Sequence, residues 1–81
     1  MARYRRKRPK KLAGKLREIR LRLGMTQIEL AKELGTDSGS ISRFETGKRE
    51  PSLLEILAYS RLSGVGVELL IDDKTSLTKK R

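Results

Sequence analysis

Four glycines set the main constraint on what this chain can fold into, because each one follows a short segment whose apolar residues recur at helical spacing. They are Gly24, Gly35, Gly47 and Gly64, and Gly66 follows closely after the last of them. Glycine adopts a left-handed backbone conformation at little steric cost and therefore commonly ends helices. No period typical of β-strands and no internal repeat is present. The sequence predicts an all-α fold of about five short helices.

Apolar residues recur every three or four positions in the first three segments, which is typical of helices that bury one face. The predicted inward residues are Leu12, Leu16, Ile19 and Leu23 in the first helix, Leu30, Ala31 and Leu34 in the second, and Ile41 and Phe44 in the third. Thr26 is the expected N-cap of the second helix, and Thr36 with Asp37 supplies cap chemistry for the third. Pro51 and Ser52 are expected to begin a fourth helix.

The fourth predicted helix has two apolar stripes, which indicates more than one packing contact. Its predicted stripes consist of Leu53, Ile56, Leu57 and Ser60 facing inward, and of Leu54, Ala58 and Leu62 on an adjoining face. A further short helix is predicted with the residues Val67, Leu70 and Ile71 on its inward face.

Length and composition exclude most kinds of chemistry. A chain of 81 residues predicts one domain, and the absence of cysteine and histidine excludes disulfides, thiol nucleophiles, zinc fingers and imidazole bases. With 36% apolar residues, a small core is expected without a sizeable ligand pocket beside it. We therefore expect a protein that is not an enzyme and binds no cofactor or metal ion. The longest unbroken apolar run, residues 56–59, is too short to span a bilayer, so a cytoplasmic location is expected.

Positive charge is concentrated at the start of the chain. The formal net charge is +10, and residues 1–22 carry all of the excess, with eleven lysines and arginines against one glutamate. Such a segment predicts a polyanionic partner, nucleic acid first and an anionic membrane surface second. The membrane alternative is weakened because the apolar face of the first helix is needed for the core.

Residues 1–11 are predicted to form a flexible basic arm, because they hold many cations and almost nothing to bury. The expected DNA contacts of this arm are Arg3, Arg5, Arg6, Lys7 and Arg8. Two interpretations stay open for it: contact with phosphates or the minor groove, or a nonspecific solubilising segment. Residues 72–81 are predicted to be a polar C-terminal tail whose Asp72 and Asp73 are solvated.

Residues 26–46 are predicted to form a helix-turn-helix, an arrangement that presents one helix to the major groove of DNA. The chain resembles the lambda-repressor-like, Cro/C1-type (XRE) family through Thr26-Gln27, Glu29-Leu30-Ala31, Leu34-Gly35, Ile41-Ser42-Arg43, Glu45, Gly47-Lys48 and Pro51-Ser52-Leu53. The resemblance extends over residues 12–71, the predicted domain. It implies a five-helix transcriptional regulator that binds double-stranded DNA, usually as a homodimer, in bacteria or phage.

The resemblance also implies roles for individual residues. Base readout is implied for Ser38, Gly39, Ser42 and Arg43, phosphate contact for Gln27, Thr46, Lys48 and Arg49, and a structural ion pair for Arg20 with Glu45. Arg43 can donate two hydrogen bonds to a guanine, although a contact to phosphate alone is the alternative. Many relatives have long polar side chains where this chain has Ser38 and Gly39.

Three alternatives concern the surroundings of the predicted reading helix. Gly39 either allows close approach to DNA or is simply tolerated there. The loop with Lys48 and Arg49 either contacts phosphates or is a solvated basic turn. Finally, helix-turn-helix antitoxins and restriction-modification controllers suggest a protein partner, such as a toxin or the transcription machinery, in addition to DNA. The second stripe of the fourth helix, with Leu69 nearby, suits either that partner or a homodimer.

Overall fold

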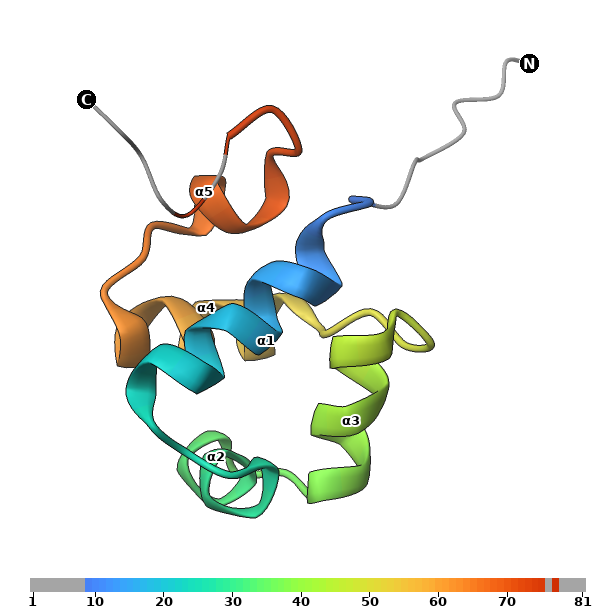
Figure 1. Cartoon of the computed structure of the whole chain (residues 1–81), viewed down its shortest axis with the longest axis vertical. Coiled ribbons are helices and arrows are strands. Elements are labelled where there is room, and N and C mark those ends of the chain that lie inside the picture. The colour runs from blue at the N-terminus through green and yellow to red at the C-terminus, as the bar shows by residue number, and fades with distance from the viewer. Residues whose placement is uncertain (1–8, 76, 78–81) are drawn as a thin grey trace.

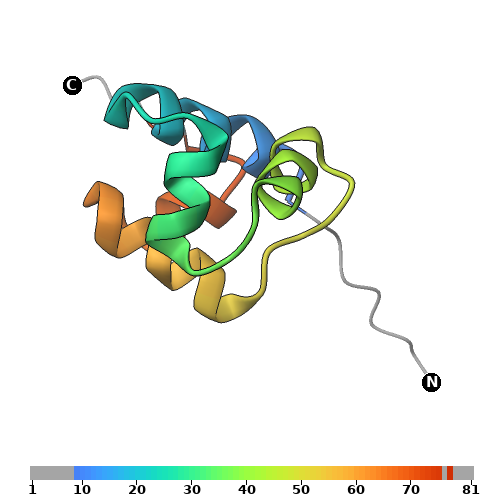
Figure 2. The same ribbon diagram turned by 90° about the horizontal axis from the view of Figure 1, so that it is seen from below.

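Five helices make up the part of the chain that this computed structural model describes, residues 9–75 and 77. They are α1 (Leu12–Leu23), α2 (Gln27–Leu34), α3 (Ser38–Thr46), α4 (Leu53–Ser63) and α5 (Val67–Ile71). In Figure 1, α1 crosses the middle of the molecule in front of α4, while α5 packs near the start of α1 at the top. Both α1 and α2 contact α3, whose arrangement with α2 is visible from below in Figure 2. The predicted all-α fold is confirmed.

The helix boundaries follow from caps that the sequence contains. Gly35 ends α2 with a φ of 71°, and its amide bonds back to the last turn of the helix. The glycines that end α1, α3 and α4 adopt the same left-handed conformation. Thr26 and Ser52 form capping boxes at the starts of α2 and α4, and the Asp37 side chain accepts from the Ser40 amide at the start of α3. Thr36 is not the cap of α3.

The core lies where the five helices converge. Its buried apolar residues are Leu12, Leu16, Ile19, Leu30, Ala31, Ile41, Phe44, Ile56, Tyr59 and Leu70. Leu23 and Leu34 are partly buried against this cluster. The predicted inward faces of the first three helices are therefore correct.

The prediction for α4 was wrong at two positions. Leu53 is 79% exposed and Leu57 is 36% exposed, whereas Tyr59, which the sequence did not single out, is fully buried. The reason is that α4 is apolar on nearly every side, so its pattern does not decide which stripe faces the core. Ile56 is buried as expected. On α5, Leu70 is buried but Ile71 is 45% exposed, again contrary to the prediction.

Within residues 9–75 and 77, no helix is both long and apolar enough to cross a membrane. The same residues contain no group of three or more metal-ligating side chains that could hold an ion.

Candidate nucleic-acid interface

The outward face of α3 carries all four residues expected to read bases. Ser38, Gly39 and Ser42 are partly exposed and Arg43 is exposed, and their spacing of three and four places them on one side of the helix. On the opposite side Ser40, Ile41 and Phe44 are buried. The structure thus brings the four residues together on a helix whose other face is fixed in the core.

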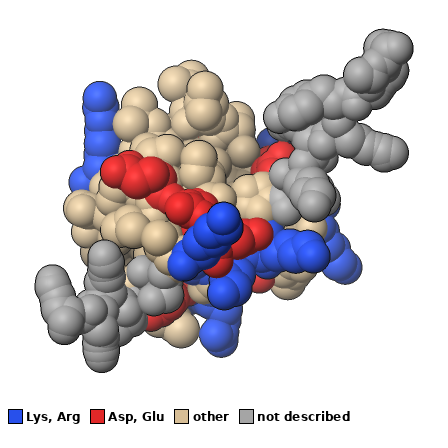
Figure 3. Space-filling model, turned by 90° about the horizontal axis from the view of Figure 1, so that it is seen from above, with Lys and Arg blue, Asp and Glu red and all other residues tan. Residues whose placement is uncertain are grey.

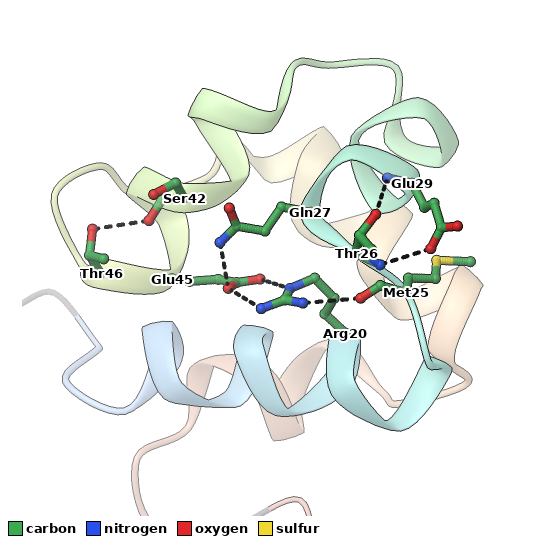
Figure 4. A network of polar contacts seen from close by, with 8 residues as sticks. All are labelled: Arg20, Met25, Thr26, Gln27, Glu29, Ser42, Glu45 and Thr46. Atoms are coloured by element: carbon green, nitrogen blue, oxygen red, sulfur yellow. Dashed lines mark hydrogen bonds and ion pairs between the residues drawn. The ribbon is translucent and has the colours of Figure 1, made fainter.

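A polar network connects the end of α3 to α1 and to the start of α2 (Figure 4). Arg20 donates from Nε to Glu45 Oε2 at 2.8 Å and from Nη2 to Glu45 Oε1 at 3.0 Å. A third donor, Arg20 Nη1, bonds to the Met25 carbonyl at 3.0 Å. Gln27 Nε2 donates to Glu45 Oε1 at 3.2 Å. Side chains from α1 and from the start of α2 therefore hold the Glu45 carboxylate in place, and the Met25 carbonyl orients Arg20.

This network neutralises the one acid within α3. The Glu45 side chain is only 3% exposed, and the hydrogen bond to that carboxylate raises the pKa of Arg20 above its ordinary value. Buried ion pairs of this kind fix orientation more than they add net stability, because both charges lose their hydration. The pair implied by the family resemblance therefore holds α3 at a defined angle to α1.

The Arg43 side chain folds back over Gly39. A Cβ atom placed on Gly39 would lie 3.2 Å from Arg43 Nη1 and 3.3 Å from Asp37 Oδ1, so the guanidinium and the carboxylate converge above this glycine. The pKa of Asp37 is lowered mainly by the hydrogen bonds from Ser40, and the positive charge of Arg43 lowers it further. Gly39 thus provides the space in which Arg43 lies along the helix.

The loop after α3 is more engaged with its own chain than the sequence indicated. Arg49 Nη1 donates to Ser40 Oγ at 3.1 Å, and its guanidinium lies 5.4 Å from the centroid of the Phe44 ring. The backbone amides of Lys48 and Arg49 both donate to the Arg43 carbonyl, at 3.0 and 3.2 Å. These two loop amides are therefore engaged within the chain, whereas the side chains of Lys48 and Arg49 are both exposed.

Two other residues expected to contact phosphate also bond within the protein. Thr46 Oγ1 donates its hydrogen to the Ser42 carbonyl at 3.0 Å, so this exposed hydroxyl has to leave that carbonyl before it can donate to a phosphate. Gln27 is half-buried and belongs to the network around Glu45. No sequence pattern indicates that one glutamine side chain links α2 to α3.

The described start of the basic arm lies beside the end of α3. Pro9 and Lys10 line one groove together with Phe44, Gly47 and Pro51. The residues for which DNA contacts were expected, Arg3, Arg5, Arg6, Lys7 and Arg8, lie outside the described residues.

Comparison with known proteins identifies the family. Residues 16–70 match the helix-turn-helix family, which is more than half of the chain. The chain belongs to the lambda-repressor-like, Cro/C1-type helix-turn-helix family. Two proteins from Archaeoglobus fulgidus, each described as an uncharacterised HTH-type transcriptional regulator, are 37% and 35% identical to this chain. The alignments cover 74% and 83% of this chain and 89% and 96% of those proteins.

Solved structures of this helix-turn-helix family have the same fold. The P22 c2 repressor, solved in complex with a synthetic operator, superposes with a TM-score of 0.72 at 26% identity, over 76% of this chain and 94% of its own. The restriction-modification controller protein C.AhdI from Aeromonas hydrophila gives a TM-score of 0.67 at 32% identity, over 74% and 91%. The family expected from the sequence is confirmed, and with it a DNA-binding regulator.

Proposed function

We propose that this chain regulates transcription by inserting α3 into the major groove and reading the base sequence there. The observation that carries the proposal is the contrast between the two sides of α3, one fixed in the core and the other polar and accessible. The major groove of B-DNA, about 12 Å wide, accommodates a helix of about 10–12 Å diameter. No catalytic step is part of this function.

Arg43 is the main reading residue in this proposal. Its guanidinium can donate two hydrogen bonds to O6 and N7 of a guanine, whereas Ser38 and Ser42 can bond to several bases. Gly39 brings the backbone of α3 close to the groove floor, because it has no side chain in the way. Arg43 has to leave its position over Gly39 to reach a base, and a flexible side chain allows this.

Phosphate contacts would fix the register of α3 in the groove without reading the sequence. We assign them to Gln27, Thr46, Lys48 and Arg49, and to the basic arm. Lys48 is the strongest of these because its side chain is exposed and, unlike those of Gln27, Thr46 and Arg49, makes no hydrogen bond within the described residues. Arg49 can contact phosphate from its place over Phe44, since its guanidinium retains donors beyond the one used by Ser40.

A homodimer is the form in which we expect the protein to bind, with α4 as the contact. Leu53 and Leu54 are 79% and 76% exposed, and Leu54 and Leu57 line a groove between α4 and α2. Glu33 and Arg61 belong to the same groove. A second copy related by a two-fold axis can pair the glutamate of one chain with the arginine of the other.

The second candidate is a regulator that also binds another protein, either as an antitoxin or as a restriction-modification controller. The similarity to C.AhdI favours a controller. The leucines of α4 would then contact the partner or a second copy of the chain. Sedimentation of the purified chain tests whether the α4 leucines contact a second copy, because a homodimer forms without an added protein, whereas contact with another protein requires that protein to be added.

The deciding experiment is a selection of binding sites from randomised duplex DNA at near-physiological salt. Enrichment of one palindromic sequence with half-site centres about 34 Å apart supports both base reading and the dimer. Enrichment of a single half-site supports reading by a monomer. Recovery of unselected sequences would overturn the proposed function.

Two variants separate reading from phosphate contact. Arg43→Ala should lose preference at one base pair, worth about 1–3 kcal/mol. Lys48→Ala should weaken binding to all sequences alike and lower the salt slope by about one. If the two variants changed the selected site in the same way, the assigned roles would be incorrect.

A further inference from the structure

Helices α1 and α5 cap each other through charged side chains. The Asp73 carboxylate, just after α5, accepts hydrogen bonds from the backbone amides of Lys10 at 2.8 Å and Lys11 at 3.0 Å. In return, Lys15 Nζ on α1 donates to the carbonyls of Leu69 and Asp72, the latter at 2.8 Å. The negative charge of Asp73 thus lies at the positive, N-terminal end of the α1 dipole. The positive charge of Lys15 lies at the negative, C-terminal end of the α5 dipole.

Asp73 provides a cap that the start of α1 lacks. Lys11 is the N-cap residue, its side chain makes no capping hydrogen bond, and no acid occurs in the first turn. Amides at a helix start have no partner within the helix, and the distant Asp73 accepts from the two that directly precede α1, those of Lys10 and Lys11. These two hydrogen bonds are also the main cause that lowers the pKa of Asp73.

Lys15 fixes the other half of this contact. This lysine is only 5% exposed, so the ammonium depends on protein acceptors in place of water. The carbonyls at the end of α5 are those acceptors, and this holds the segment with Asp73 against α1. In Figure 3, which looks onto the α5 side, acidic side chains lie directly beside lysine and arginine side chains.

The amides that Asp73 holds belong to the described root of the basic arm. Lys10 and Lys11 are both exposed, and Pro9 with Lys10 borders the groove next to Phe44 and Gly47 at the end of α3. Asp73 therefore fixes the backbone at Lys10 and Lys11, where the described residues meet the basic arm.

We propose that Asp73 is a positioning residue for DNA binding, which anchors the root of the basic arm so that its cations reach the same DNA as α3. This inference rests on the proposed function. Without the anchor, the backbone at Lys10 and Lys11 loses two hydrogen bonds, so ordering the start of the arm on DNA costs more conformational entropy. Asp73 acts here although its own charge opposes DNA.

The direction in which DNA affinity changes when Asp73 is removed distinguishes an anchoring acid from one that only repels phosphates. Removing an acid near DNA strengthens binding if that acid only repels phosphates. Removing an acid that anchors the arm weakens binding, since the arm then binds fewer phosphates. The two roles therefore predict opposite changes for Asp73→Ala.

The experiment measures the affinity for a random-sequence duplex and its salt dependence in full-length variants. Four chains are compared: the unchanged chain, the Asp73→Ala variant, a neutralised-arm variant, and a variant that combines both changes. The neutralised-arm variant has glutamine in place of Arg3, Arg5, Arg6, Lys7 and Arg8. Glu68→Ala is the matched control, because it removes an exposed acid from α5 that makes no capping bond to α1. Hydrogen exchange of the Lys10 and Lys11 amides reports on the anchor without DNA.

We expect Asp73→Ala to weaken binding about fivefold and to lower the salt slope by about 0.9 for each phosphate that the arm no longer neutralises. In the chain with the neutralised arm the same substitution should change affinity less than about twofold. Both amides should exchange faster in Asp73→Ala, and Glu68→Ala should not weaken binding. The milder Asp73→Asn, which keeps one acceptor oxygen, should have an intermediate effect if Asp73→Ala folds poorly.

Three outcomes would overturn the inference while duplex binding persists. They are equal or tighter binding by Asp73→Ala, equal weakening in both arm backgrounds, and unchanged exchange of the two amides. Equal weakening would mean that Asp73 only stabilises the fold. Failure of the unchanged chain to bind any duplex would instead overturn the proposed function, and the inference with it.

Discussion

The outward faces of α3 and α4 differ in nearly every physical respect. On α3 the outward residues are small or hydrogen-bonding, and the helix is held from behind by Glu45 with Arg20 and Gln27. On α4 the outward residues are leucines, of which Leu53 and Leu54 are among the most exposed apolar side chains described. One face is suited to a polar, charged partner and the other to an apolar one.

This difference shows that one small chain can contain two surfaces with separate requirements. The polar α3 face loses little free energy by staying in contact with water. Its use in binding depends instead on the helix being held rigidly. The α4 face gains about 25 cal/mol for each Å² of apolar surface that a partner covers, so its contribution depends on burial. Changes on the α3 side should therefore act on stability or base preference, and changes on α4 should act on association.

The largest effect is expected from breaking the support of α3. Arg20→Met leaves the Glu45 carboxylate buried without its cation and should lower the free energy of unfolding by about 3 kcal/mol. Urea denaturation measures this change. Arg17→Met, which replaces an exposed arginine on the same helix, is the control and should cost less than about 0.5 kcal/mol. Equal costs for both variants would show that the network does not hold α3.

The next effect concerns α4. Leu54→Glu should weaken self-association at least tenfold, about 1.4 kcal/mol, because a charge enters the proposed apolar contact. Analytical ultracentrifugation over a range of concentrations measures it. Leu21→Glu is the control, since Leu21 is 52% exposed but does not line the α4 groove. An unchanged chain that stays monomeric throughout would remove α4 as a dimer surface.

A smaller effect on stability is expected from filling the space over Gly39 with a methyl group. Alanine is favoured over glycine within helices by about 1 kcal/mol, but a Cβ at Gly39 crowds Arg43 and the cap residue Asp37. Gly39→Ala should therefore stabilise the fold by only about 0.5 kcal/mol. Gly14→Ala on α1, where a Cβ meets nothing within 4 Å, should give nearly the full gain. Thermal unfolding compares them, and an equal gain would mean that Arg43 moves aside freely.

The smallest effect is expected from the cap of α3. The pKa of Asp37 in the folded chain lies below its ordinary value, so the charged cap stabilises the fold at neutral pH. This contribution is lost as the pH falls through the folded-state pKa. Asp37→Asn keeps a capping oxygen without titrating and should flatten the acid side of a stability profile measured with urea. Glu68→Gln, which neutralises an exposed acid on α5, is the control, and the same flattening in both would rule out the cap.

The sequence was sufficient for the helices because the chain marks their ends explicitly. Gly24, Gly35 and Gly47 stand where left-handed caps occur, and Thr26 and Asp37 have side chains that accept from free amides. The inward faces of α1, α2 and α3 followed from spacing, since each has a single apolar stripe. These are local signals, and local signals are what a sequence displays directly.

The remaining features depend on which helices pack against each other. The spacing of apolar residues along the sequence does not show which helices do so. Lys15 looks like any surface lysine until α5 packs over it. Asp73 was expected to be solvated, but it caps α1 from 62 residues away. Arg49 was expected either to contact phosphate or to lie in a solvated turn, and its position over the Phe44 ring was not foreseen. The four base-reading candidates fall on one face as predicted, and their role on DNA stays a prediction.

Tyr59 is a natural spectroscopic probe of the core. The chain has two tyrosines and no tryptophan, so ultraviolet emission from this buried ring is not masked by an indole. Its hydroxyl has no hydrogen-bond partner within the described residues, and burial raises the pKa of the phenol. Because burial disfavours the phenolate, ionisation of Tyr59 is favoured by opening of the core. In a Tyr4→Phe variant, which leaves Tyr59 as the one tyrosine, the phenolate absorbance at alkaline pH would report that opening without an attached dye.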